Sequence, residues 1–304
     1  MKCRSEWVFG AVFLCLAKES ENDVYWIGYE KRRWLFVITT LIFDLDDTLL
    51  WDKKSVATAF RKTCERAAQL HDVEPTALEE AVRVEARELY AAYDTYEFTK
   101  MIGINPFEGL WGTFDDAGES FQKMKEIVPG YRREAWIKGL QRLGIEDVAL
   151  GSELAELFPT ERKKHPFLYE ETFSVLDKLK GSYKLALLTN GSPSLQHTKL
   201  EITPEIVPYF DHIIISGTFG KGKPDVSIFH HVLETCGIGK DEALMVGDNL
   251  MTDILGASRV GMRSVWINRE EAKLAEGSTP TYEIDNLEKL FPILETLTKE
   301  EAIR

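Results

Sequence analysis

The sequence predicts an α/β protein with a doubly wound, Rossmann-like parallel sheet, into which a helical cap domain is inserted. Two observations lead to this prediction. Apolar runs rich in β-branched residues alternate with helix-like stretches over residues 166–304, a pattern that requires crossover connections between parallel strands. Residues 52–165 carry only helical patterns. We therefore assign residues 37–51 and 166–304 to the core and residues 52–165 to the cap.

Five apolar runs predict the strands of the core: 37–47 (VITTLIFDLDD), 183–190, 210–216, 242–249 and 262–268. Such runs lack a polar face, as expected for strands covered by helices on both sides. Helical patterns lie between them at 168–180, 193–202, 225–236 and 252–260. The segment 286–299 predicts a closing amphipathic helix, because Leu287, Leu290 and Leu294 fall on one stripe.

The predicted cap contains five helical patterns: 55–70, 76–93, 119–128, 133–144 and 151–158. A loop rich in glycine, GINPFEGLWGTF at 103–114, interrupts them and could line a cleft with Phe107, Glu108 or Trp111. The segments LWDKK and RKKHP, at the two ends of the cap, are the candidate hinges on which it opens and closes.

Other cap residues have structural interpretations. Tyr90, Tyr93, Tyr96 and Phe98 have the spacing of packed helix faces, so we expect them to contribute to the cap core. Arg132 and Arg133 could bind a carboxylate, but a solvated helix face is the favoured interpretation.

Composition restricts the partners. The chain has 304 residues, a formal net charge of −13 and no long cluster of lysine and arginine, so we expect neither a nucleic-acid nor a membrane partner. The four cysteines lie far apart and show no metal-ligand spacing. A reducing, cytoplasmic compartment is therefore expected.

Residues 1–36 have two interpretations. Their apolar run WVFGAVFLCLA is too short to span a bilayer, and no small-residue cleavage pattern follows it. KRRW at 31–34 is compatible with codons that contain a bacterial ribosome-binding sequence, and Val37 with a GTG start codon. The segment is either a translated leader outside the native protein or a genuine N-terminal extension.

Polar residues recur where the predicted strands end. The stretch LIFDLDDTLL crowds three aspartates after the first strand, although like charges repel at close range. Each such residue alone is typical of a turn or a helix start. Together they predict one site, because the carboxyl ends of parallel strands meet at one edge of the sheet. The residues are Asp44, Asp46, Asp47, Thr189, Asn190, Asp248 and, in a loop before a helix, Lys223.

The ordered segments DLDDT, LLTNG, GKPD and GDNLMTD resemble the four motifs of the haloacid dehalogenase-like (HAD) hydrolase superfamily. The resemblance covers the chain from about residue 38, and a helical cap between the first and second motifs is a standard layout of that superfamily. The stretches GINPFEGLW and GDNLMTDILGA are similar to a group of bacterial cytosolic phosphatases, some of which are assigned as phosphoserine phosphatases.

This resemblance implies a role for each residue. Asp44 is the expected nucleophile, which forms an aspartyl-phosphate, and Asp46 the acid that protonates the leaving alcohol and then deprotonates water. Two residues apart in an extended chain, their side chains point the same way. Thr189, Asn190 and Lys223 are expected to bind the phosphoryl group.

The expected cofactor is Mg²⁺, because hard oxygen ligands favour this ion. Its predicted ligands are the carboxylates of Asp44 and Asp248 and the main-chain carbonyl of Asp46. Asp253 is expected either to bind the ion through a water molecule or to orient the direct ligands. Asp47 is expected to stabilise the loop or to be solvated, and Thr48 to fix the loop by hydrogen bonding.

The expected activity is hydrolysis of a small phosphorylated metabolite, and a dehalogenase would not need the acid at Asp46. The similarity to the bacterial phosphatases makes O-phosphoserine the first substrate to test. Phosphoglycolate, sugar phosphates and nucleotides stay open as substrates, and a sugar phosphomutase stays open as a mechanism. A catalytically idle binding module is the alternative of a different class.

Overall fold

The core of the protein is a parallel sheet of six strands. The structure, a computed structural model, describes residues 37–274, 277 and 279–303, so both interpretations of residues 1–36 lie outside the described residues. The strands are β1 (Thr40–Phe43), β2 (Lys184–Thr189), β3 (His212–Ile215), β4 (Ala243–Gly247), β5 (Arg263–Ile267) and β6 (Tyr282–Ile284). The predicted fold class is confirmed.

The strand order is β3-β2-β1-β4-β5-β6, and every neighbouring pair is parallel. The chain builds β1, β2 and β3 in one direction and then returns to the other side of β1 to add β4. Such a reversal leaves a crevice at the carboxyl ends of the two strands, here β1 and β4. The edge strand β6 was not predicted, because its three residues are too few to show a pattern.

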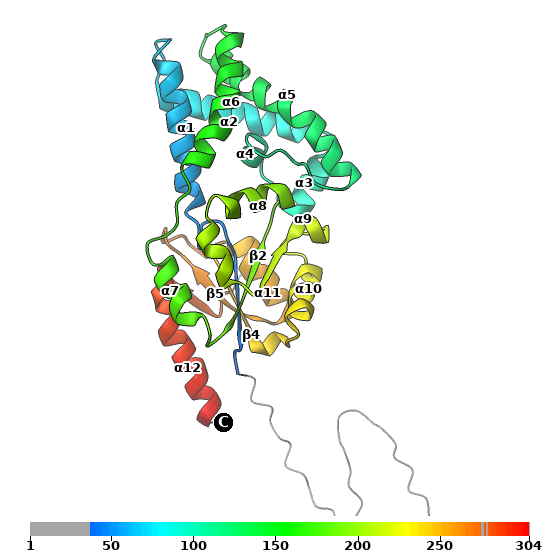
Figure 1. Ribbon diagram of the computed structural model, residues 1–304, viewed down its shortest axis with the longest axis vertical. Coiled ribbons are helices and arrows are strands. Elements are labelled where there is room, and N and C mark those ends of the chain that lie inside the picture. Colours follow the sequence, from blue (N-terminus) through cyan, green and yellow to red (C-terminus); the bar gives the residue numbers. More distant parts are fainter. Residues whose placement is uncertain (1–36, 275–276, 278, 304) are drawn as a thin grey trace, which may run out of the picture. The chain divides into compact units, whose positions relative to one another are not determined.

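Helices cover both faces of the sheet, as Figure 1 shows. Leu41 and Phe43 of β1 belong to the apolar cluster that includes α7 (Thr172–Leu179) and α12 (Leu290–Ile303). Ile42, which points the opposite way, packs with α10 (Val226–Cys236) and α11 (Leu255–Val260). This two-residue alternation explains why the strands read as continuous apolar runs.

The remaining core elements are short. They are α8 (Pro193–Glu201), η1 (Pro204–Tyr209), α9 (Ser216–Phe219), η2 (Lys240–Glu242), the π-helical turn η3 (Leu250–Ile254) and η4 (Leu287–Lys289). The elements α8, α9 and η3 each follow directly after the carboxyl end of a strand, on the side where the crevice lies.

The cap consists of helices with their own core. They are α1 (Asp52–Ala68), α2 (Pro75–Ala92), α3 (Tyr96–Ile102), α4 (Pro106–Gly109), α5 (Glu119–Arg142) and α6 (Val148–Lys164). The rings of Phe60, Trp136 and Phe158 join α1, α5 and α6, with centroids 4.6 to 5.9 Å apart. The four predicted aromatic residues, Tyr90, Tyr93, Tyr96 and Phe98, belong to or pack against this core, as expected.

Two local features of the cap differ in detail from the prediction. The predicted patterns 119–128 and 133–144 form one continuous helix, α5, with Pro129 inside it. The predicted loop 103–114 contains the helical turn α4, which Asn105 and Glu108 close at its start by a reciprocal capping box. The sequence NPFE carried that signal.

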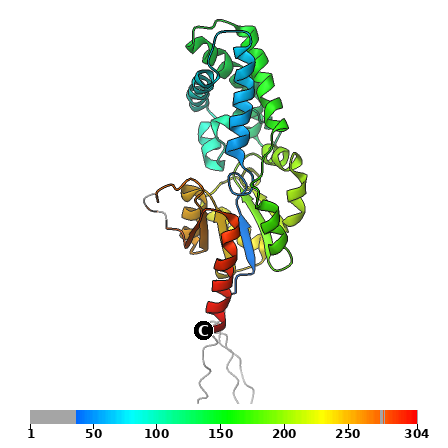
Figure 2. The same cartoon turned by 90° about the vertical axis from the view of Figure 1, so that its left-hand side faces the viewer.

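The two connections between core and cap run side by side. The Trp51 N–H donates to the carbonyl of Phe167 over 2.8 Å, and the rings of Trp51 and Tyr169 stack with centroids 5.2 Å apart. In both views, the cap helices lie together at the upper end of the described structure, with the sheet below them (Figures 1 and 2). The predicted boundaries and hinge motion stay predictions. Within the described residues, no helix has both the length and the apolar composition needed to cross a membrane.

Two glycines of α5 are expected to respond in opposite ways to alanine. A Cβ at Gly139 would lie 2.4 Å from Cγ2 of Val82 and 3.1 Å from its backbone, whereas one at Gly130 would meet nothing within 4 Å. Gly139→Ala should lower the free energy of unfolding by about 1–3 kcal/mol through overpacking. Gly130→Ala should raise it by about 0.4–1 kcal/mol. Denaturant titrations of both variants test this, and equal shifts would contradict the packing of α2 on α5.

Candidate active site

Asp44, directly after β1, forms the centre of the site with a buried lysine. The Lys223 ammonium lies 2.5 Å from Oδ1 of Asp44 and 2.7 Å from Oδ1 of Asp253. It also donates to the carbonyl of Leu188 over 2.7 Å. A lysine has three N–H donors, so these contacts hold its position on all sides. Burial disfavours the charge of Lys223, but the adjacent carboxylates of Asp253 and Asp44 raise its pKa.

Asn190 holds the backbone of Lys223. Its side-chain oxygen accepts from the Lys223 N–H over 2.8 Å, and its amide donates to the Lys223 carbonyl over 3.0 Å. A Cβ at Gly103, the residue that ends α3, would lie 2.4 Å from this amide. The predicted phosphate contact of Asn190 stays a prediction, while its observed contacts position the lysine.

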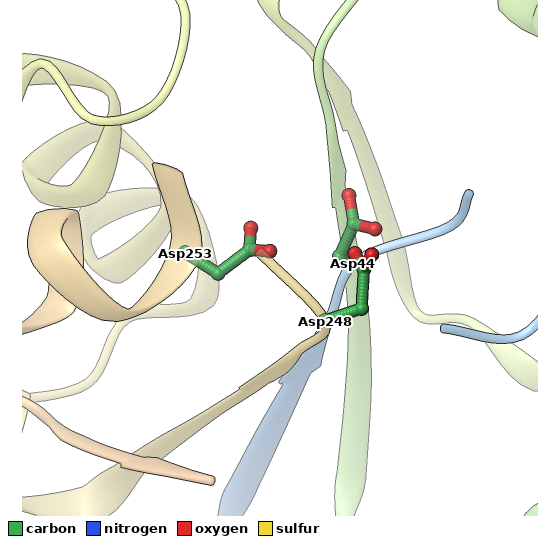
Figure 3. A group of neighbouring side chains, drawn as sticks. All are labelled: Asp44, Asp248 and Asp253. Atoms are coloured by element: carbon green, nitrogen blue, oxygen red, sulfur yellow. The ribbon is translucent and has the colours of Figure 1, made fainter. Parts of the chain in front are cut away.

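Three carboxylates meet at the crevice between β1 and β4. Oxygens of Asp44, Asp248 and Asp253 lie within 4.8 Å of one another, and Figure 3 shows the three side chains converging from different segments. Asp253 can pack directly against the backbone of Gly247 because this residue has no side chain. A Cβ at position 247 would lie only 2.4 Å from the Asp253 carboxylate. The Asn249 N–H donates to Oδ2 of Asp253 over 3.1 Å.

The protein alone does not balance the charge of this cluster. Burial raises the pKa of Asp44 to about 6, against the opposing effect of Lys223. Burial, together with the charges of Asp44 and Asp253, raises the pKa of Asp248 to about 9. A divalent cation would offset this repulsion, and an all-oxygen donor set fits Mg²⁺. Both oxygens of Asp253 have protein partners, the Lys223 ammonium and the Asn249 N–H, whereas Lys223 contacts only one oxygen of Asp44. Asp44 and Asp248 are therefore the carboxylates best placed as direct ligands.

Asp46 contacts a second buried lysine. Its Oδ2 accepts from the ammonium of Lys199 over 2.7 Å, while its buried Oδ1 has no partner within the part of the chain that the structure describes. Lys199 also donates to Oε1 of Glu108, a cap residue, over 3.1 Å. Burial raises the pKa of Asp46 to about 6, against the opposing effect of Lys199. Lys199 therefore holds the carboxyl at one oxygen, and the raised pKa lets Asp46 keep its proton to a higher pH than an ordinary aspartate.

Comparisons with known proteins show the family to which the chain belongs. A family model described as haloacid dehalogenase-like hydrolase matches residues 38–261. The chain belongs to this family. It is 31% identical over 251 residues to a phosphoserine phosphatase from Thermus thermophilus, covering 83% of this chain and 97% of that protein. It is 30% identical over 183 residues to N-acylneuraminate-9-phosphatase from Mus musculus, covering 59% and 73%.

The solved structures show the same HAD fold. The putative HAD-hydrolase YfnB from Bacillus subtilis aligns with a TM-score of 0.60 and 24% identity, covering 85% of this chain and 99% of that one. The predicted superfamily and fold are confirmed. The predicted enzyme class, a hydrolase of phosphoric monoesters, is confirmed by the family match together with the phosphatase relatives.

The other predicted residues of this HAD hydrolase surround the centre. Thr189, at the end of β2, is buried, and its hydroxyl lies 3.4 Å from the side-chain oxygen of Gln196. Thr48 accepts from the Asp248 N–H over 3.1 Å and thus fixes the loop, as predicted. Asp47, with φ of 58°, accepts from the Lys53 N–H over 2.9 Å at the start of α1, which confirms a loop-stabilising contact.

Of Phe107, Glu108 and Trp111, the residues predicted to line the cleft, Glu108 contacts Lys199, the partner of Asp46, in the described structure. Phe107 packs under the guanidinium groups of Arg83 and Arg87, and Trp111 under that of Arg162. The predicted solvated face is wrong for Arg132, which donates to the carbonyl of Gly112 over 2.9 Å, whereas Arg133 is exposed.

Sequence reasoning missed Lys199 and a cavity beside the site. Lys199 lies on α8, where a lysine in a helical pattern is normally interpreted as solvated. The cavity, of about 330 Å³, opens next to Asp248, and its lining includes Lys53, Tyr169 and Arg269. The guanidinium of Arg269 stacks on the Tyr169 ring at 3.5 Å. No sequence motif marked Lys199, Tyr169 or Arg269.

Two neighbouring aspartates of the HAD hydrolase provide a matched test of the site. Asp44→Asn should lower phosphate release by at least about 10³-fold, because an amide is a poor nucleophile. Asp47→Asn should retain activity within about threefold, because asparagine tolerates a positive φ and can still accept from Lys53. Phosphate release with circular dichroism of both variants tests this. Substantial turnover by Asp44→Asn would mean that the nucleophile is misassigned.

Proposed function

We propose that the protein is a Mg²⁺-dependent phosphomonoesterase that acts through an aspartyl-phosphate on Asp44, with O-phosphoserine as the first candidate substrate. The observation that carries the proposal is the pairing of two aspartates, one buried and one partly buried, with two buried lysines at one edge of the sheet. Lys223 pairs with Asp44, and Lys199 with Asp46. The two carboxylates thus have separate partners and can serve separate roles.

The first step transfers the phosphoryl group to the enzyme. A carboxylate oxygen of Asp44 attacks phosphorus, the bond to the alcohol oxygen breaks, and Asp46 gives its proton to that oxygen. Lys223 offsets the negative charge of Asp44 and of the phosphoryl oxygens, which the Thr189 hydroxyl binds. Bound Mg²⁺, held by Asp44, Asp248 and the Asp46 carbonyl, would supply further charge stabilisation of the phosphoryl group.

The second step releases phosphate. Asp46, now ionised, takes a proton from a water molecule that attacks the phosphorus of the aspartyl-phosphate. The bond between phosphorus and the Asp44 oxygen then breaks, and both carboxyl groups return to their initial states. A phosphomutase would instead pass the phosphoryl group to an acceptor hydroxyl at this stage.

The choice of substrate is supported by likeness and by size. The match to the phosphoserine phosphatase from Thermus thermophilus covers 97% of that protein and 83% of this chain. The cavity of about 330 Å³ beside Asp248 lies at the small end of ligand sites, and its lining includes Asp248 but neither Asp44 nor Asp46. A sugar phosphate is the second candidate, since N-acylneuraminate-9-phosphatase is a further relative. The buried free thiols of Cys64 and Cys236 suit a reducing compartment, so a cytoplasmic location is part of the proposal.

Removing the metal should stop the reaction. Excess chelator is expected to abolish phosphate release, and added Mg²⁺ to restore it, because Asp44 and Asp248 then lose and regain their counter-charge. A readout independent of activity is the melting temperature, which Mg²⁺ should raise in the wild type but not in Asp248→Asn. Full activity in chelator would rule out the metal role.

A phosphate-release screen tests the function itself. The panel contains phosphoserine, phosphoglycolate, hexose phosphates, N-acylneuraminate 9-phosphate and nucleoside monophosphates. We expect the highest kcat/KM for phosphoserine. A clear preference for another monoester would change the substrate but not the activity. Phosphoryl transfer between sugar phosphates that exceeds release would favour a mutase, and no turnover of any compound would favour the idle binding module.

A further inference from the structure

We propose that Lys199 is a positioning residue that holds Asp46 in the orientation for proton transfer, and that Glu108 makes this hold depend on the docked cap. The inference rests on the proposed function, because it concerns the acid of the same phosphoryl transfer. It links a core helix, a catalytic loop and the cap through one buried ammonium group.

Lys199 is placed to fix the orientation of the Asp46 carboxyl group. It lies on α8, its side chain is 3% exposed, and its ammonium is 2.7 Å from Oδ2 of Asp46. The other oxygen of Asp46, Oδ1, is buried and has no partner among residues 37–274 and the other described positions. Lys199 thus fixes the rotation of the carboxyl group that, in the proposed function, exchanges a proton with the leaving oxygen and with water. Without Lys199, the carboxyl could rotate and present either oxygen in either direction.

Glu108 brings the cap into this arrangement. Its Oε2 accepts from the Asn105 N–H over 3.0 Å and thereby closes the first turn of α4. Its Oε1 accepts from Lys199 over 3.1 Å, and the Glu108 side chain is 8% exposed. Because α4 itself fixes the carboxylate, the contact with Lys199 exists only when α4 lies against α8. Docking of the cap therefore gives the Lys199 ammonium its second carboxylate partner, Glu108, in addition to Asp46.

A second contact docks the cap onto the same helix without touching Asp46. The carboxylate of Asp116, from the cap, accepts from the backbone N–H and from the hydroxyl of Ser194, both over 2.7 Å, at the start of α8. Asp116 thus provides a matched control. Loss of the contact between Asp116 and Ser194 should perturb only the docking of the cap on α8. Loss of the contact between Glu108 and Lys199 should perturb this docking and also the orientation of Asp46.

The chemistry of the leaving group separates these effects. A leaving oxygen that is strongly basic needs the proton of Asp46 as its bond to phosphorus breaks, whereas a weakly basic one departs as the anion. Phenyl phosphate and p-nitrophenyl phosphate differ in this respect and are similar in size. The constant kcat/KM reports formation of the aspartyl-phosphate, so the ratio of kcat/KM for phenyl phosphate to that for p-nitrophenyl phosphate measures proton donation.

The first experiment compares Lys199→Met with the wild type. We expect kcat/KM for phenyl phosphate to fall by about 10²-fold or more, the usual contribution of a general acid, and that for p-nitrophenyl phosphate by less than about tenfold. Lys199→Arg, which keeps the charge, should recover part of the ratio. Equal losses for both substrates in Lys199→Met would overturn the positioning role. If the wild type releases no phosphate from either compound or from the metabolite panel, the proposed function itself fails.

The second experiment keeps Lys199 and tests the link to the cap, so it also serves if Lys199→Met does not fold. Glu108→Gln should lower the ratio by about tenfold, as expected for the loss of one hydrogen bond to a charged group. Asp116→Asn should leave the ratio unchanged even if both constants fall. An unchanged ratio in Glu108→Gln, or an equal change in Asp116→Asn, would overturn the cap link.

Discussion

The contact between the Lys223 ammonium and the Asp44 carboxylate is the interaction on which the rest of the site depends. Asp44, Asp248 and Asp253 lie close enough together to repel strongly in a buried place. Lys223 offsets part of that repulsion, and it bonds to Asp44, Asp253 and the Leu188 carbonyl at once. Removing one partner of such a buried pair leaves an uncompensated charge, which costs more than the pair itself contributes. The lysine therefore joins segments from β1, β2 and η3 into one rigid unit.

Lys199 applies the same physical solution to Asp46, with a different result. Asp44 shares its lysine with another core carboxylate, whereas Asp46 shares its lysine with Glu108 from the cap. Asp44 thus shares its lysine within the core, and Asp46 shares its lysine with the cap.

The topology explains why these groups meet. The reversal of strand order places the ends of β1 and β4 side by side, which brings Asp44 and Asp248 together. The cap is inserted a few residues after Asp44, so its helices start and end beside the crevice. Its contacts with α8, through Glu108 and Asp116, lie on the strand-end side of the sheet.

By itself, the sequence determined the parallel sheet, the helical insertion, the positions of Asp44, Asp46 and Asp248 at the strand ends, and that of Lys223 in a loop before a helix. These features depend on local patterns: apolar runs, strand-end polar residues and the order of four short segments. Only the tertiary structure decided that Lys199 is buried between Asp46 and Glu108, and that Asn190 holds the Lys223 backbone. Lys199 lies 153 residues from Asp46 and 91 from Glu108 in the chain, so packing rather than local pattern brings them together. The same physical reason applies to β6, whose three residues become a strand only by pairing with β5.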